Sequence, residues 1–161
     1  MQIVNTSEPF VLTADNVNLY LISNTVPEIM EIRLPSRIES VDEAASTAAD
    51  FARENGLGDE HLSAIDLAVR ESVAYAVKHG NKFDENKEVE VRLEQTTDEF
   101  EITVRDQGTG FDVGEIPDPT DPANLLKVSG RGILFMRSFM DVVEWFTSEN
   151  GGTTVKMSKK L

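Results

Sequence analysis

The sequence predicts an α+β fold, a two-layer sandwich in which helices cover one face of a mostly antiparallel sheet. Alternating apolar and charged residues predict a hairpin over residues 89–104, and helical apolar spacing predicts helices both before and after it. Two further strands are predicted near the C-terminus. The length of 161 residues suits one compact domain, so we expect an N-terminal arm over residues 1–27 and a domain over residues 28–161.

The first predicted elements are a strand and two helices. Apolar residues alternate with charged ones over residues 30–34, as in a half-buried strand. Ser40 and Glu43 have the spacing of a capping box, which predicts the start of a helix, and Gly56 predicts its left-handed stop. A second helix is predicted from about residue 59 to residue 78, since its apolar residues recur at helical intervals.

The second predicted helix has two different faces. At about 100° per residue, its apolar residues form one stripe, which we expect to face the core. Its polar residues fall on the opposite side and are expected to face a ligand cleft together. The stripe consists of Leu62, Ile65, Val69, Val73 and Ala76, and the polar face consists of Glu71, Tyr75, Lys78 and His79.

The remaining elements follow the hairpin. Residues 112–128 lack periodicity and contain three of the six prolines, which predicts a lid or a disordered loop. A third helix is expected after Gly132, then strands over residues 142–147 and 153–157 with a glycine-containing turn between them. A short strand over residues 16–23 is expected in the arm.

Composition excludes several classes of function. The 29 Asp and Glu residues exceed the 15 Lys and Arg residues, and the net charge of −14 would repel nucleic acid and anionic membranes. A nucleotide would therefore have to be met by backbone N–H groups or by a divalent cation. Without cysteine, thiol catalysis and disulfides are excluded. No signal peptide or membrane span is evident, so we expect a cytoplasmic protein.

Three glycine-marked segments occur in a fixed order: residues 71–80, residues 106–110 and residues 129–132. Glycine lets a backbone approach a ligand closely, and a helix that begins behind two glycines can hold a phosphate. Taken alone, the second segment is also compatible with an ordinary turn and the third with a simple helix start. In this order, the three segments predict a nucleotide pocket.

On these segments the chain resembles the GHKL ATPase superfamily and, within it, the RsbW-type family of anti-sigma factors and serine protein kinases. LAVRESVAYAVKHGNK resembles the N box, DQGTGF resembles the first glycine box, and DPTDPANLLKVSGRG resembles the lid and second glycine box. The resemblance covers about residues 30–160. It implies a Bergerat-type fold, ATP and Mg²⁺ as cofactors, a sigma factor and a STAS-type antagonist as partners, and a homodimer. The implied activity is sequestration of the sigma factor and phosphorylation of a serine on the antagonist.

The resemblance also implies roles for individual residues. Glu71 matches the general base that takes the proton from the substrate serine, and Asp106 matches the carboxylate that accepts the adenine amino group. The other implied nucleotide contacts are Lys78, Gly108, Gly110, Gly130, Arg131, Gly132 and one threonine of the last strand, Thr154 or its neighbour Thr153.

One residue departs from the family pattern. The family places a magnesium-ligating asparagine four residues after the glutamate, and this chain has Tyr75 there. A neutral phenol is a poor ligand for a hard cation. Two functions therefore stay open: a serine kinase with one changed residue, or a partner-binding module whose nucleotide chemistry is degraded. A sensor histidine kinase would need an upstream phospho-acceptor helix, and residues 1–29 contain no histidine.

Overall fold

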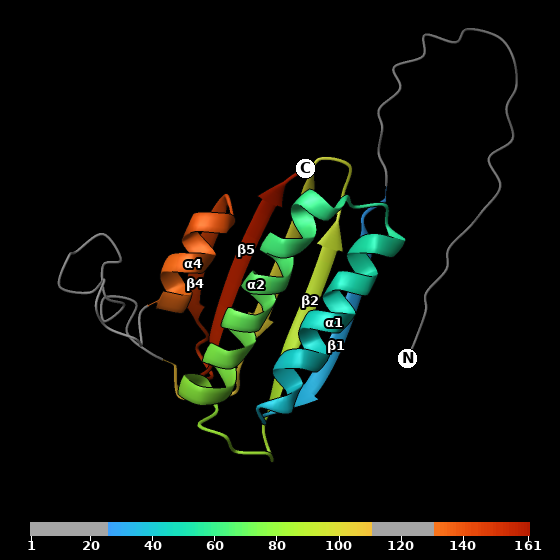
Figure 1. The fold of residues 1–161 in the computed structure, drawn as a ribbon. Coiled ribbons are helices and arrows are strands. Elements are labelled where there is room, and N and C mark those ends of the chain that lie inside the picture. Colours follow the sequence, from blue (N-terminus) through green and yellow to red (C-terminus); the bar gives the residue numbers. More distant parts are fainter. Residues whose placement is uncertain (1–25, 111–130) are drawn as a thin grey trace, which may run out of the picture.

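The structure, a computed structural model, describes residues 26–110 and 131–161. Its helices and strands are drawn in Figure 1. In chain order they are β1 (Glu28–Pro35), α1 (Glu39–Glu54), α2 (Asp59–Tyr75), the π-helix η1 (Ala76–Gly80), β2 (Glu88–Gln95), β3 (Glu99–Arg105), α4 (Arg131–Phe139), β4 (Val142–Thr147) and β5 (Thr153–Lys160).

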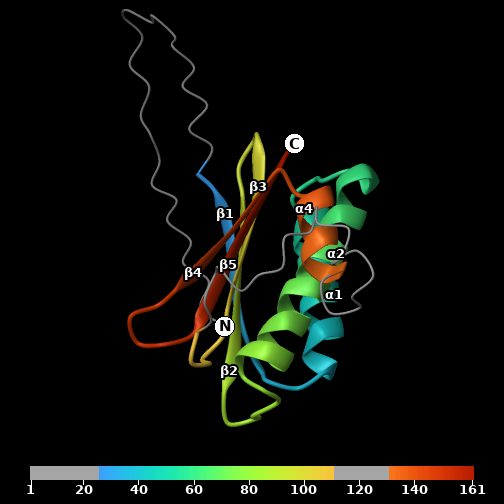
Figure 2. The ribbon, with the colours of Figure 1, turned by 90° about the vertical axis from the view of Figure 1, so that its left-hand side faces the viewer.

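The described strands form one five-stranded sheet in the order β1-β2-β3-β5-β4. Every neighbouring pair in this sheet is antiparallel. Figure 2 shows α1, α2 and α4 together on one side of the sheet. The predicted α+β sandwich is therefore confirmed, because each helix buries its apolar stripe against the apolar face of the same sheet.

The core lies between these two layers. In the hairpin of β2 and β3, Val91 lies opposite Val104 and Leu93 opposite Ile102, and all four side chains are buried. The stripe predicted on α2 is also confirmed, since all five of its apolar residues are buried. Among the described helices, none is both long enough and apolar enough to cross a membrane.

The capping box predicted at Ser40 is wrong. The helix α1 already begins at Glu39, and Ile38 precedes it without a side-chain cap. Ser40 is buried, and its hydroxyl donates a hydrogen bond of 2.6 Å to the carbonyl oxygen of Pro35. The hydroxyl therefore binds the end of β1 instead of the first turn of the helix. The predicted stop is confirmed, since Gly56 has a φ of +81°.

The predicted second helix changes type before it ends. It is α-helical through Tyr75 and then forms the π-helical turn η1, in which the Asn81 N–H donates to the Ala76 carbonyl oxygen at 2.8 Å. Such turns are rare and occur frequently at functional sites. Here η1 carries Lys78 and His79 and ends against the segment that follows β3.

Three predictions concern residues outside the described ranges. The strand expected over residues 16–23 and the lid expected over residues 112–128 both fall there, and so does Gly130. The division into an arm over residues 1–27 and a domain over residues 28–161 stays a prediction, although β1 begins at Glu28.

Candidate functional site

The polar face of α2 and η1 meets the first turns of α4 across a cavity of about 290 Å³. Four residues that the helical periodicity placed on one face line this cavity together, which confirms that prediction. The lining residues are Glu71, Ala74, Tyr75, Lys78, His79, Gly132, Ile133 and Met136. The alanine, the isoleucine and the methionine were not predicted, because small and apolar residues give no sequence signal that separates a cavity wall from a core.

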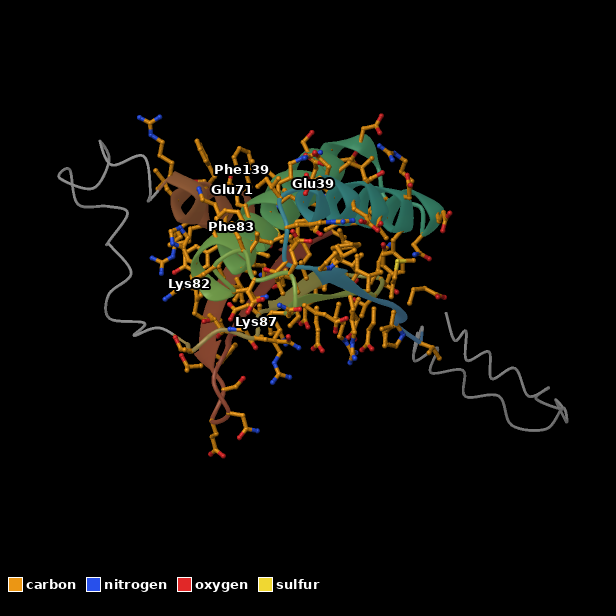
Figure 3. All side chains as sticks on the ribbon, turned by 90° about the horizontal axis from the view of Figure 1, so that it is seen from below. Glu39, Glu71, Lys82, Phe83, Lys87 and Phe139 are labelled. Atoms are coloured by element: carbon orange, nitrogen blue, oxygen red, sulfur yellow. The ribbon has the colours of Figure 1, made fainter. Side chains whose placement is uncertain are left out.

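Glu71 lies directly against the N-terminal turn of α4 (Figure 3). A Cβ atom added to Gly132 would lie only 2.2 Å from the Glu71 Oε2 atom. Glycine at this position therefore lets the carboxylate approach the helix start. Arg131, the first residue of α4, has an exposed side chain. The Glu71 carboxylate thus lies against the positive end of a helix dipole, and the first residue of that helix carries a guanidinium, a group suited to binding phosphate.

Asp106 directly follows β3, and the residue is only 2 % exposed. Its Oδ1 atom accepts hydrogen bonds from the backbone N–H groups of Gly108, at 2.8 Å, and Thr153, at 3.1 Å. Burial raises the pKa of Asp106, and these two hydrogen bonds oppose the rise. The carboxylate is therefore held in one orientation, as recognition of a planar donor such as an amino group requires.

Two glycines let the end of η1 pack against this carboxylate. A Cβ atom at Gly80 would lie 2.3 Å from the Asp106 Cγ atom, and one at Gly108 would lie 2.3 Å from the Gly80 carbonyl oxygen. Gly152 has a φ of +85°, and a Cβ there would lie 2.3 Å from the Asp106 carbonyl oxygen. The first two glycine-marked segments are therefore in direct contact. From the sequence, Gly152 was predicted only as part of a turn. Its contact with Asp106 leaves no local pattern, because the two residues are 46 positions apart in the chain.

Tyr75 stacks against His79 in the cavity, with ring centroids 4.8 Å apart and an interplanar angle of 38°. Burial, together with the negative charge of Asp106, raises the pKa of Tyr75 above the ordinary value of 10.0. The phenol therefore stays neutral near pH 7. A neutral aromatic side chain occupies the place at which the resemblance implied a metal-binding amide.

Asn81 does not replace that amide. Its side chain is 1 % exposed, its Nδ2 atom donates to the Glu88 carbonyl oxygen at 2.9 Å, and its Oδ1 atom accepts the Gln107 N–H at 2.7 Å. The amide thus ties η1 to the start of β2 and the end of β3. Within the described ranges, no group of three or more His, Cys, Asp or Glu side chains is arranged to hold a metal ion. Neither Tyr75 nor Asn81 therefore offers the cavity the amide oxygen that the resemblance implied for magnesium.

Comparison with known protein families gives one match of high coverage. Residues 34–159 match the histidine kinase-like ATPase domain. The chain belongs to this family. The match includes every element from the last residues of β1 to β5, and with them both walls of the cavity.

Individual known proteins are also similar to the chain. It is 38 % identical over 104 residues to the anti-sigma F factor of Clostridium perfringens, covering 63 % of this chain and 74 % of that protein. It is 27 % identical over 143 residues to the serine-protein kinase RsbW of Listeria innocua, covering 85 % and 90 %. With the RsbW kinase of Bacillus subtilis, it shares 29 % identity over 140 residues, covering 83 % and 86 %.

The candidate site does not include Thr154. Side chains alternate along β5, so Thr153 lies on the face of the sheet that carries buried Val155 and the helices, whereas Thr154 lies on the opposite face beside Arg105. Its predicted place near the nucleotide is therefore corrected. The neighbouring Thr153, whose N–H binds Asp106, is the threonine at the site.

The other predicted residues have the following places. Gly110 has a φ of +78°, and a Cβ there would lie 2.5 Å from the Thr147 Cγ2 atom, so it packs against the end of β4. Lys78 has an exposed side chain at the cavity wall. The structure thus brings Glu71 and Lys78 to one cavity with Gly132, and brings Gly108 to Asp106 beside it.

Asp106 should make the stability of the folded chain depend on pH. Because its pKa in the folded chain is raised above the ordinary 3.8, the ionised carboxylate costs stability that the protonated one does not. Wild type should therefore lose stability relative to Asp106→Asn as the pH rises through the raised pKa. Below the pKa that Asp106 has in the unfolded chain, this destabilisation should vanish. Melting temperatures of both proteins between about pH 3 and 7 measure this difference. The exposed Asp98→Asn serves as control, and a pH-independent difference would contradict the prediction.

The two glycines of the site should respond differently to alanine. In Gly108→Ala the new Cβ meets a backbone carbonyl, so we expect a loss of about 1–3 kcal/mol. In Gly132→Ala it meets only the mobile end of Glu71, so we expect a change in stability within about 0.5 kcal/mol. Urea unfolding of both variants makes the comparison. If both variants lose the same free energy of unfolding, the close approach of residue 108 to the Gly80 carbonyl oxygen is not the reason that position 108 requires glycine.

Proposed function

We propose that this chain is an ATP-binding anti-sigma factor and serine protein kinase. It captures a sigma factor, and it phosphorylates a serine of a small STAS-type antagonist protein to control that capture. The observation that carries the proposal is the contact of Glu71 with Gly132, since it places a carboxylate at the helix start where the terminal phosphate of a nucleotide would lie. The names of the similar proteins support both halves of the proposal.

The proposed reaction assigns a task to each residue at the site. Glu71 takes the proton from the substrate serine hydroxyl, whose oxygen then forms a bond to the γ-phosphorus of ATP. The bond from that phosphorus to the bridging oxygen breaks, and ADP leaves. Arg131 and Lys78 offset the phosphate charge, and Asp106 accepts the adenine amino group. Such a general base contributes about 10²–10⁴ in rate.

Magnesium takes no part in this assignment. When bound, the ion would offset phosphate charge, but Tyr75 supplies no hard ligand and the amide of Asn81 is already engaged. The positive charge at the site thus comes from Arg131 and Lys78 on the protein side. We therefore propose that ATP binding depends only weakly on magnesium.

The partners are part of the same proposal. The net charge of −14 favours a basic surface on the sigma factor, because complementary charge speeds association. A sigma factor acts on transcription, which places the proposed activity in the cytoplasm. We also propose that the chain forms a homodimer, and sedimentation equilibrium of the purified chain measures this.

Tyr75 favours one second candidate, a module that binds its partner without turning ATP over. A transfer assay distinguishes the two functions: purified chain, γ-labelled ATP and a STAS-type antagonist are incubated with and without a sigma factor. Labelled phosphoserine on the antagonist supports the kinase. Capture of the sigma factor without any labelled antagonist supports the module. Loss of both would show that neither function is right.

A further inference from the structure

The helix α4 exposes two phenylalanines. Phe135 is 42 % exposed and Phe139 is 45 % exposed. Residues four positions apart share one face of a helix, so Arg131, Phe135 and Phe139 form a single row, which we call the α4 stripe. Figure 3 shows Phe139 on the outer side of the helix layer, away from the sheet. The α4 stripe is therefore open to a partner.

The other side of α4 is held by the rest of the fold. Ile133 is 6 % exposed and belongs to the core. The Arg137 Cζ atom lies 5.4 Å from the centroid of the Trp145 ring on β4. Because α4 is fixed by this side, its two exposed rings stay turned outward. Single exposed apolar residues are ordinary, whereas aromatic rings that share one face are typical of interaction surfaces.

The α4 stripe begins at the site of the proposed chemistry. Gly132 follows Arg131 directly, and a Cβ atom there would lie 2.2 Å from the Glu71 Oε2 atom. At a rise of 1.5 Å per residue, Phe135 lies about 6 Å and Phe139 about 12 Å beyond Arg131 along the helix axis. A protein whose serine reaches Glu71 therefore comes within one or two helical turns of both rings.

Charge separates the two proposed partners of the chain. The helix α4 carries two arginines and no aspartate or glutamate, whereas α1 carries five acidic side chains and one basic side chain. A basic surface on the sigma factor would be attracted to α1 and repelled by α4. The α4 stripe therefore suits the other partner, the antagonist that supplies the serine.

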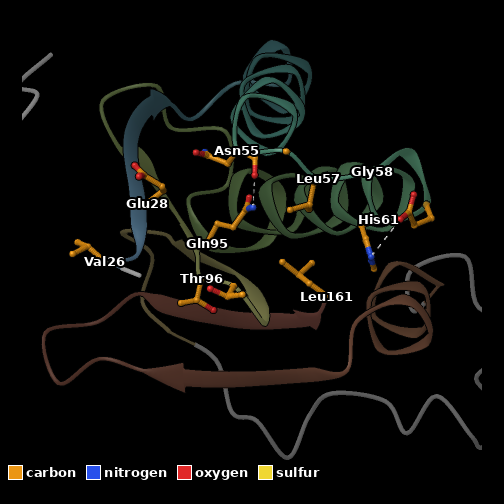
Figure 4. A pocket seen from close by; sticks show the side chains of 12 residues that line it. Val26, Glu28, Asn55, Leu57, Gly58, His61, Gln95, Thr96 and Leu161 are labelled. Atoms are coloured by element: carbon orange, nitrogen blue, oxygen red, sulfur yellow. Dashed lines mark hydrogen bonds and ion pairs between the residues drawn. The ribbon is translucent and has the colours of Figure 1, made fainter. Parts of the chain in front are cut away.

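A larger cavity, of about 450 Å³, does not compete for this role. It lies at the other end of α2, where Leu57 and His61 line its wall (Figure 4). His61 precedes Glu71 on α2 by a distance of about 15 Å along the helix axis. A segment that fills this cavity is too far from Glu71 to present its serine there.

We propose that Phe135 and Phe139 form the docking surface for the serine-bearing face of the antagonist. This inference rests on the proposed kinase function. With its serine hydroxyl at Glu71, the antagonist places apolar side chains over the two rings, about 6 and 12 Å from Arg131. It carries no lysine or arginine at these positions, because Arg131 would repel them. The rings hold the substrate protein and take no part in the transfer of phosphate.

Transfer of labelled phosphate from ATP to a STAS-type antagonist tests this surface with the full chain. In the double variant Phe135→Gln and Phe139→Gln, we expect the KM for the antagonist to rise at least about tenfold. The kcat at saturating antagonist and the affinity for ATP should stay within about twofold of wild type, since only binding of the substrate protein is lost.

The matched control is Phe146→Gln on β4. Phe146 is 49 % exposed and lies opposite Thr154 in the register, on the face of the sheet that carries no helices. This variant removes a ring of similar exposure outside the α4 stripe and should leave the KM for the antagonist unchanged. If it raises that KM as much as the double variant does, the effect is not specific to α4 and the docking proposal is wrong.

Calorimetry of each variant with the antagonist keeps the docking test independent of phosphate transfer. If wild type binds the antagonist and transfers no phosphate, the kinase function is wrong, and the affinities still decide the docking surface. Equal affinity of wild type and the folded double variant for the antagonist overturns the docking proposal. If wild type does not bind the antagonist at all, the docking proposal fails together with the kinase function.

Three further results would assign the α4 stripe to a different occupant and so overturn the proposal. A double variant that loses the sigma factor and keeps the antagonist would assign the stripe to the sigma factor. A dimer that becomes a monomer in sedimentation equilibrium would assign it to a second copy of the chain. A melting temperature lower by more than about 5 °C would show that the chain itself covers the rings.

Discussion

Replacing Glu71 with glutamine is expected to lower the rate of phosphate transfer to serine by about 10²–10⁴. The amide has the shape of the carboxylate, so the close contact with Gly132 and the cavity wall should persist. It cannot take the proton from the serine hydroxyl. ATP affinity should stay nearly unchanged, since the adenine contact proposed for Asp106 is elsewhere in the site.

Single-turnover transfer from labelled ATP to the antagonist measures this rate, and calorimetry with ATP measures binding separately. Glu43→Gln, on an exposed face of α1, is the matched control and should transfer phosphate at the wild-type rate. If Glu71→Gln lowers ATP affinity and leaves the transfer rate of the bound complex intact, Glu71 contributes to binding and is not the base.

Tyr75→Asn is expected to make the reaction depend on magnesium. A divalent ion close to the phosphates changes the barrier substantially, since one unit charge pair at about 4 Å and an effective dielectric of about 20 is worth roughly 4 kcal/mol. That energy corresponds to about three orders of magnitude in rate. We therefore expect transfer by the variant, in the presence of magnesium, to exceed that of wild type by up to about 10³. Wild-type ATP affinity should change by less than about threefold when EDTA removes the metal.

Titration of wild type and Tyr75→Asn with ATP, each with magnesium and with EDTA, gives the four affinities that the comparison needs. Tyr75→Phe is the matched control because it keeps the ring beside His79 and removes only the hydroxyl. It should behave like wild type. A wild-type protein that already loses ATP binding in EDTA would refute the assignment, because a metal would then be held despite the phenol.

The local spacing of apolar residues predicted the two layers of the fold. Alternation along β2 and β3 predicted the hairpin, and helical spacing along α2 and η1 predicted both the buried stripe and four of the residues that line the cavity. These predictions hold because the side-chain direction repeats every two residues in a strand and every 3.6 in a helix. The order of the three glycine-marked segments was likewise sufficient to indicate a nucleotide pocket and the family.

The sequence by itself therefore determined the class of fold and the family, and it predicts which residues carry the chemistry. The partners of individual residues were decided by packing between distant parts of the chain. Thr153 lies at the site instead of Thr154 because β5 turns that face toward the helices, and the amide of Asn81 joins three elements instead of holding a metal. Gln95 reaches the Asn55 carbonyl oxygen only because packing brings the loop after α1 to the end of β2. Local periodicity specifies which way a side chain points, whereas the atoms it meets depend on segments that only folding brings together.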